Sequence, residues 1–309
     1  MRFNPKARLD RSQVQNRRGN GGGGGSGIRG GMGGGLPVGG GIGGVLLIIV
    51  VVVVSQMLGG GSPDSGAPGD SGAVSTGGDE LSQCESGADA NSDPDCARLA
   101  LVNSIQSFWS RALEQQSGQR YQQADTVIFS NQVDTGCGGA TSDVGPFYCP
   151  PDQQVYLDTT FFDDMLEGQL GGQGGDFAEA YVLAHEYGHH VQNLLGTMGR
   201  VRTQQGANSD AVRLELQADC YAGMWTKYAT QAEDGQGRVL IEELTQQDIE
   251  EALDAARAVG DDRIQQKTSG RIVPDRWTHG SADQRMAWFT TGREQGSLEA
   301  CDTFAVAQL

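Results

Sequence analysis

The stretch that most constrains this chain is residues 176–195, where apolar and ionisable side chains share one predicted helix. His185 and His189 are four residues apart, so they project from one face of a helix, about 40° apart in direction. Glu186 is rotated from His185 by roughly 100° and can reach a water on an ion that the two imidazoles hold. A buried helix must give its ionisable groups partners. The spacing predicts that the partner is Zn²⁺.

Sequence signals at both ends support this helix, which matters because a His-Glu-x-x-His pattern also arises by chance. Asp176 precedes Glu179 by three residues, a pattern that predicts an N-cap with a capping box. Gly196 suits the first position beyond a helix end. The apolar side chains between these signals are typical of a helix in a domain interior: Phe177, Ala178, Ala180, Tyr181, Val182, Ala184, Val191, Leu194 and Leu195.

Two imidazoles leave a zinc ion short of a protein ligand, and a second predicted helix supplies the candidate. Residues 208–225 open with N-capping residues and place apolar side chains on one stripe. Glu215 and Asp219 lie beside this stripe, a poor position for two carboxylates unless cations meet them. We predict Glu215 as the third zinc ligand and Asp219 as the acceptor for the outer N–H of a ligating histidine. The alternative is a pair of solvated acids on an amphipathic helix.

His279 is the predicted donor to an oxyanion that develops during a reaction. It precedes a predicted helix at residues 284–294, for which the segment from Ser281 to Gln284 provides a capping box. A helix N-terminus disfavours an imidazolium, so we expect a neutral, hydrogen-bonding ring. The alternative is a structural hydrogen bond within a loop.

A few other residues have weaker indications. His190 is offset by about 140° from His185 and is predicted to pack rather than to bind metal. Tyr148 and Tyr156 are further candidates for the oxyanion donor. Residues 155–157 form a predicted strand that could pair with an extended peptide, or could be an ordinary core strand.

One strongly apolar segment, residues 36–58, lies near the start of the chain, and its 23 uncharged residues can cross a bilayer. Residues 1–35 are basic and glycine-rich in a chain of net charge −17, and predict a disordered cytoplasmic tail. The positive-inside rule then places everything after Gly59 outside. A cleavable signal peptide is the alternative, although no small-x-small cleavage site follows Val54.

The remainder divides into a linker and a domain. Residues 59–80 are rich in Gly, Ser, Pro and Asp, which predicts a flexible linker. Residues 81–309 suffice for one domain with a hydrophobic core, expected on the outer face of the cytoplasmic membrane. Their acidic character argues against nucleic acid as a partner. The expected partners are a peptide or protein substrate and the membrane.

All six cysteines follow the apolar segment, and an even number in a predicted exterior indicates disulfides. None has the CxxC spacing of a zinc knuckle. Six cysteines allow fifteen pairings. The sequence leaves the choice open, and three plausible pairs are Cys84 with Cys96, Cys137 with Cys149, and Cys220 with Cys301.

Helical and strand patterns elsewhere predict the fold class. Apolar periodicity predicts further helices over residues 97–116, 160–170 and 239–259. Short β-branched runs predict strands at 126–129 and 154–157. The pattern predicts an α+β, helix-rich fold.

Four blocks of sequence together resemble the neutral zinc metallopeptidase family of bacterial membrane-anchored proteins. The blocks are residues 185–192, 215–223, 146–149 and 278–285. The resemblance covers nearly the whole chain, including the basic tail and the single anchor. It implies a zincin-like domain of gluzincin type with a His, His, Glu metal site.

These patterns predict a membrane-anchored zinc metallopeptidase with Glu186 as general base. The alternative is a non-hydrolytic binding or scaffolding module that keeps zinc as a structural clamp. Structural zinc sites close the fourth position, usually with Cys or His, and the sequence offers no fourth ligand. The presence of Glu186 also favours hydrolysis.

Overall fold

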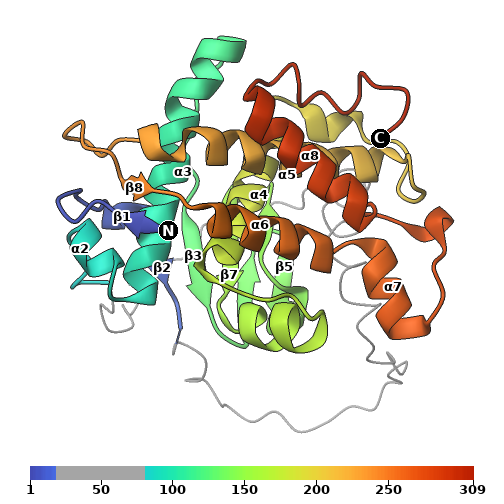
Figure 1. The fold of residues 1–309 in the computed structure, drawn as a ribbon, viewed down its shortest axis with the longest axis horizontal. Helices are drawn as coiled ribbons and strands as arrows, with labels where there is room; N and C mark the ends of the chain where they lie inside the picture. The colour runs from blue at the N-terminus through green and yellow to red at the C-terminus, as the bar shows by residue number, and fades with distance from the viewer. Residues whose placement is uncertain (19–80) are drawn as a thin grey trace, which may run out of the picture.

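A four-stranded sheet lies beneath a layer of helices in the computed structural model, which describes residues 1–18 and 81–309 (Figure 1). The strands follow the order β2 (Val14–Asn16), β3 (Thr126–Phe129), β7 (Gln154–Asp158) and β6 (Phe147–Cys149). Strands β2 and β7 run parallel to β3, and β6 runs antiparallel to β7. The predicted strands at 126–129 and 154–157 are confirmed. The predicted anchor (36–58) and linker (59–80) lie outside the described residues.

The two faces of the sheet have different partners because successive strand residues point to opposite sides. Ile128, Val155 and Leu157 pack with the helices in the main hydrophobic core. Val127, Phe129 and Tyr156 pack on the other face, in a smaller core that includes a β-hairpin. The hairpin consists of β4 (Gln132–Thr135) and β5 (Gly138–Thr141).

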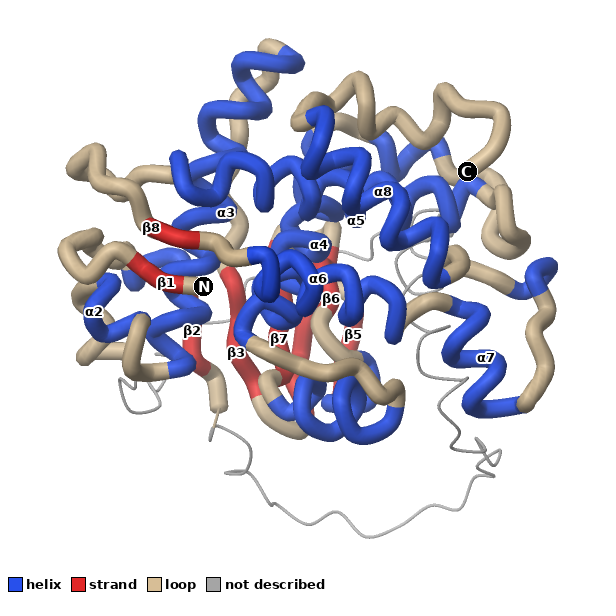
Figure 2. The backbone as a smooth tube through the Cα atoms, in the orientation of Figure 1, coloured by secondary structure: helices blue, strands red, loops and turns tan. Residues whose placement is uncertain are grey.

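Helices contribute most of the main core, and Figure 2 shows how they are arranged around the sheet. They are α2 (Gly87–Ala90), α3 (Pro94–Ser117), a π-helix (Phe161–Gln169), α4 (Asp176–Leu194), α5 (Asp210–Tyr228), α6 (Gln246–Ala258), α7 (Asp261–Ser269) and α8 (Ala282–Gln295). Single turns of 3₁₀-helix occur at Arg11–Gln13, Ser142–Val144, Thr197–Arg200, Ala229–Gln231 and Pro274–Arg276. The α+β, helix-rich fold class is confirmed.

Helix α4 lies at the centre and contacts α3, α5, α6 and the sheet. Its predicted end is confirmed, because Gly196 follows it in the left-handed region. Its predicted start is one residue late. Gly175 is the N-cap, while Glu179 pairs instead with Arg98 of α3.

Helices α5 and α8 pack closely because glycine lies at the contact on both. A Cβ on Gly223 of α5 would lie 2.0 Å from the carbonyl oxygen of Phe289. A Cβ on Gly292 of α8 would lie 1.8 Å from the carbonyl oxygen of Cys220. This contact fixes the position of α8 against α5.

The first residues of the chain belong to the same folded unit. Strand β1 (Arg2–Phe3) pairs with β8 (Ile241–Glu243), and β2 extends the central sheet. The expectation of a disordered tail is therefore wrong for residues 1–18. The helix predicted at 239–259 is wrong for its first residues, because residues 241–243 form β8 and pair with β1. Helix α6 begins later, after the N-cap Thr245.

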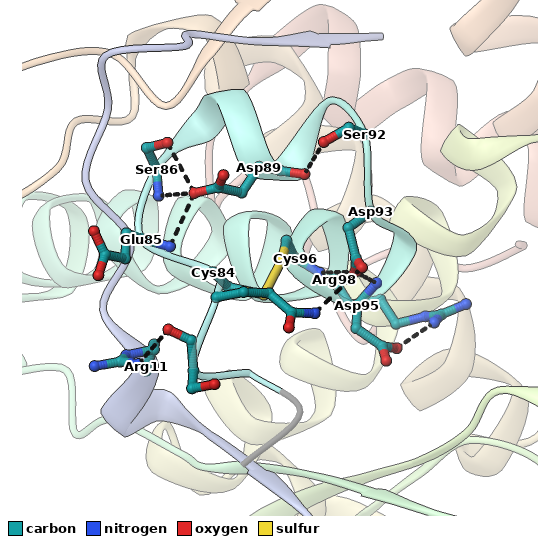
Figure 3. The surroundings of a disulfide bond; sticks show 12 residues. Arg11, Cys84, Glu85, Ser86, Asp89, Ser92, Asp93, Asp95, Cys96 and Arg98 are labelled. Atoms are coloured by element: carbon teal, nitrogen blue, oxygen red, sulfur yellow. Dashed lines mark hydrogen bonds and ion pairs between the residues drawn. A yellow bond between two sulfur atoms is a disulfide. The ribbon is translucent and has the colours of Figure 1, made fainter.

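The three disulfides pair Cys84 with Cys96, Cys137 with Cys149, and Cys220 with Cys301. These are the pairs that were considered from the sequence. The first ties the start of the second described segment to α3 (Figure 3). The third ties α5 to the C-terminal segment. Among the helices of residues 1–18 and 81–309, none has the length and apolar character to span a bilayer.

Candidate metal centre

Helices α4 and α5 bring the three predicted ligands together. Glu215 Oε2 on α5 is 3.3 Å from His185 Nε2 on α4, and Glu215 Oε1 is 3.5 Å from His189 Nε2. One nitrogen or oxygen from each of the three residues lies within 4.8 Å of those of the other two. The three side chains can therefore share one ion.

The other ring nitrogen of each histidine is already hydrogen-bonded. His185 Nδ1 is 2.8 Å from Asp219 Oδ1, and His189 Nδ1 is 2.8 Å from Gln192 Oε1. Because both partners are acceptors, each Nδ1 carries a hydrogen, and each Nε2 is the atom that would bind a metal. Gln192 donates in turn to the carbonyl oxygen of Leu214 on α5. The rings are thus fixed in the tautomer that a metal requires.

A buried arginine holds Asp219 in place. Arg285 Nε and Nη2 donate to the two carboxylate oxygens of Asp219, each at 2.9 Å. Tyr181, one turn before His185 on α4, donates to Asp219 Oδ1 at 2.6 Å. Burial acts to raise the pKa of Asp219, but Arg285 and His185 outweigh it and lower this pKa to about 2. Asp219 is ionised and lies where the predicted role requires.

The pKa values of His185 and His189 are shifted in opposite directions. Burial acts to lower the pKa of His185, but Asp219 and Glu215 outweigh it and raise this pKa to about 10. Burial dominates at His189 and lowers its pKa to about 4. Burial also opposes the ionised form of Glu215, yet the nearby histidines hold its pKa well below the ordinary value. In the metal-free site a proton on His185 takes the place of a cation.

Glu186 lines the same pocket as the three converging side chains. Its side chain is buried, and burial raises its pKa to about 7. The negative charge of Glu215 adds to this effect, while His185 and the backbone of Tyr148 oppose it. A carboxyl group with a pKa near neutrality can both accept and release a proton.

These side chains line a small pocket of about 70 Å³ together with His279 and Arg285. The apolar part of its wall consists of Val144, Pro146, Phe161, Val182 and Val259. Residues from α4, α5 and the segment before α8 therefore meet at one cavity beside the edge of the sheet.

His279 lies in this pocket, but its electrostatics differ from the expectation. His279 Nδ1 is 2.8 Å from Thr278 Oγ1 and 3.5 Å from Asp261 Oδ1. Burial acts to lower the pKa of His279, but Glu215 and Asp261 outweigh it and raise this pKa. In the metal-free site these carboxylates therefore oppose the effect that was expected from the α8 N-terminus, and the predicted role of His279 stays a prediction. The predicted capping box of α8 is confirmed.

The remaining sequence candidates lie elsewhere. His190 is buried, with Nδ1 3.0 Å from the Tyr148 hydroxyl and Nε2 2.6 Å from a backbone carbonyl oxygen, which agrees with a packing role. Because His190 Nε2 donates to that carbonyl oxygen, Nδ1 accepts the hydrogen of the Tyr148 hydroxyl, which itself accepts from Asn193. Tyr156 donates to Asp152 from the far face of the sheet. Neither tyrosine lines the pocket.

The donor set fits a divalent cation. Two imidazoles and one carboxylate are the protein ligands of several catalytic zinc sites, which keep another position open. With both imidazoles neutral, the carboxylates of Glu186, Glu215 and Asp219 face one guanidinium, Arg285, among the residues that build this centre. Two negative charges remain, and buried charges require compensation. A divalent cation between His185, His189 and Glu215 would supply it.

Residues 1–304 match the family described as "Putative neutral zinc metallopeptidase". The chain belongs to this family. The match includes residues 1–18 and confirms the resemblance carried by the four sequence blocks.

Several proteins are similar to this chain over most of their length. An uncharacterized protein of Mycobacterium tuberculosis strain H37Rv is 53% identical over 234 residues, which are 75% of this chain and 78% of that protein. An uncharacterized protein of Mycobacterium bovis gives the same values. The uncharacterized protein YpfJ of Escherichia coli K12 is 46% identical over 210 residues, 66% of this chain and 69% of its own. No solved structure gives a significant match.

Arg285 is the main residue of the centre to which sequence reasoning gave no role, although it ends one of the four blocks that mark the family. Ala282, Arg285 and Phe289 occupy the buried stripe of α8 at helical spacing. An arginine on such a stripe signals a buried carboxylate partner. Tyr181 carried a similar signal, since it precedes His185 by one helical turn.

Proposed function

We propose that this protein is a zinc-dependent peptidase with a zincin-like domain of gluzincin type. One observation carries the proposal: two imidazole Nε2 atoms and a carboxylate converge in a pocket that also contains an unligated carboxyl, Glu186. His185, His189 and Glu215 would hold the zinc, and the described residues offer no fourth protein ligand at this cluster. An open position distinguishes catalytic from structural zinc sites.

The side chains around the pocket have distinct tasks in peptide hydrolysis. Zinc, when bound, lowers the pKa of a water and polarises a carbonyl oxygen. Glu186, which lines the pocket, accepts the proton of the attacking water and returns it to the leaving amine. His279 lines the pocket and can donate a hydrogen bond to the developing oxyanion. Asp219 keeps His185 oriented through its Nδ1–H.

The sheet suggests how a peptide would be bound. Strand β7 has β3 on one side, and β6 pairs with Gln154, Val155 and Tyr156 on the other, so these three residues have no free edge for strand addition. Strand β6 ends the described sheet and contacts α4. Gly145 and Pro146, directly before β6, line the pocket. We place an extended substrate along β6, where main-chain hydrogen bonds would align it with the metal centre.

Compartment and attachment follow from the cysteines and the apolar segment. The three disulfides are typical of an oxidising compartment. Residues 36–58 provide an apolar segment for attachment to the cytoplasmic membrane. We therefore propose that the peptidase works at the extracytoplasmic face of that membrane.

The test compares the full chain with Glu186→Gln, because residues 1–18 form part of the sheet and a fragment that starts at residue 81 would lack them. Both proteins are loaded with zinc, and cleavage of an unfolded protein is measured. We expect equal zinc content and a loss of activity of about 10²–10⁴-fold. Glu250→Gln, an exposed change on α6, is the matched control. Equal cleavage by Glu186→Gln would refute the mechanism, and a zinc-loaded but inert wild type would favour the scaffolding module.

A further inference from the structure

The first eighteen residues are integral to the domain rather than attached to its surface. Strand β2 pairs in parallel with β3 over three residues and forms one edge of the central sheet. Phe3, Ala7 and Val14 are 3%, 0% and 6% exposed. A Cβ on Gly87 of α2 would lie 2.0 Å from the carbonyl oxygen of Asn4. The domain is shaped to receive this segment.

Buried polar groups in the segment and in the domain depend on one another. Asn103 of α3 accepts from the Asp10 amide at 2.7 Å and donates to the Asp10 carbonyl oxygen at 3.0 Å. Gln106 of α3 donates to Gln13 Oε1 at 2.9 Å. Asn103, Gln106 and Gln13 are all buried. Without residues 1–18, both α3 side chains would lose these partners, and an unsatisfied buried polar group costs about 1–3 kcal/mol.

Residues 9–11 also lie beside the start of the second described segment. Arg11 Nη1 donates to the carbonyl oxygen of Ser82 at 2.8 Å (Figure 3). The Leu9 amide donates to the Glu85 carbonyl oxygen at 3.1 Å. The disulfide between Cys84 and Cys96 links the start of the second segment to α3. Residues 1–18 and the start of the second segment therefore share one location on the domain.

We infer that residues 1–18 and 81–309 lie on the same side of the membrane, so residues 36–58 do not carry the chain across a bilayer once. A single crossing would separate β1 and β2 from their partner strands. Two crossings need about 40 apolar residues, more than residues 36–58 supply. The run without glycine, residues 45–58, has 14 residues, fewer than the roughly 20 that one crossing needs.

This inference replaces the orientation predicted from the arginines. Two of the arginines in residues 1–18 have partners within the acidic domain: Arg18 pairs with Asp95, and Arg2 pairs with Glu242 and Glu243. Their positions are explained by these contacts, so they need no cytoplasmic location. The disulfides then place both segments in the oxidising compartment.

The test uses cysteine labelling of the full chain in bacterial spheroplasts with a membrane-impermeant maleimide. All six native cysteines form disulfides, so an added cysteine is the reactive thiol. Lys6→Cys reports on the first segment and Gln266→Cys on the domain; both positions are exposed. A cytosolic protein with a free thiol monitors the integrity of the spheroplasts.

We expect both cysteines to react to the same extent before the membrane is permeabilised. Labelling of Lys6→Cys only after permeabilisation would overturn the inference, because the segment would lie in the cytoplasm. Labelling that required denaturant would also overturn it, because position 6 would not lie where the structure has it. The result does not depend on zinc or activity, so it can fail while the proposed peptidase function stands.

Discussion

Three acidic side chains lie around the two histidines of the centre, and they are not equivalent. Asp219 has a full guanidinium partner in Arg285, whereas Glu215 faces both imidazoles. Glu186 shares their pocket and is the carboxyl whose pKa rises to about 7. These differences assign separate tasks to acids of similar chemistry: ligation to Glu215, orientation to Asp219 and proton transfer to Glu186.

The raised pKa of Glu186 predicts how pH affects the stability of the metal-free protein. Burial raises this pKa from 4.5 to about 7. Its contribution to stability is therefore fully present below about pH 4.5 and is lost as pH rises through 7. Relative to wild type, Glu186→Gln should gain up to about 3 kcal/mol between pH 4 and pH 8. Urea unfolding of both proteins with a chelator would measure this, and parallel pH profiles would contradict the pKa shift.

Arg285 predicts an effect on metal binding that does not require activity. Arg285→Met removes both hydrogen bonds to Asp219, so His185 loses a fixed partner for its Nδ1–H. We expect zinc affinity to fall about 10–100-fold, as for other groups that orient metal ligands. Competition with a chromogenic chelator measures the affinity. Arg276→Met, an exposed change, should bind zinc as wild type does; equal affinity in Arg285→Met would exclude the positioning role.

At the scale of elements, the sequence predicts what depends on local rules. The apolar period of 3.6 and the capping residues place α3, α5 and α8 to within a few residues, and β-branched runs place β3 and β7. The contact between α5 and α8 was not predictable, because it depends on glycines 69 positions apart meeting carbonyl groups of the other helix. Arg285 had no assigned role for the same reason, since its partner lies on another helix.

That helix contact yields a prediction. A methyl group at position 223 would lie 2.0 Å from the Phe289 carbonyl oxygen, so α8 must move away from α5. Gly223→Ala should cost about 1–3 kcal/mol of stability and should weaken zinc binding, because α8 carries Arg285. Thermal unfolding and chelator competition measure the two effects. Gly199→Ala has open space around its Cβ and an ordinary φ, so it is the matched control. If Gly223→Ala were destabilised but bound zinc with unchanged affinity, the contact between α5 and α8 would not influence the metal centre.

At the scale of the whole molecule, the sequence predicted one domain after residue 80 but not the return of residues 1–18 to it. The basic and glycine-rich composition of the start of the chain hides three buried apolar residues, Phe3, Ala7 and Val14, whose partners come from more than 70 positions later. The average composition of a segment does not reveal a few buried apolar residues among many basic residues and glycines. The ligand pairs on α4 and α5 were predictable because each pair depends on spacing within one helix.

The disulfides permit a matched comparison of how chain closure stabilises the molecule. Cys220–Cys301 closes a loop with a separation of 81 residues, and Cys84–Cys96 one of 12. All four sulfurs belong to fully buried residues, so replacement by Ala has a similar local cost at both sites. Chain entropy assigns about 3 kcal/mol to a 15-residue loop and about 4.7 to a 100-residue loop. The Cys220→Ala, Cys301→Ala protein should therefore be the less stable by about 1–2 kcal/mol in urea unfolding with a chelator. Equal losses would show that local packing, rather than the length of closed chain, sets the contribution of these bonds.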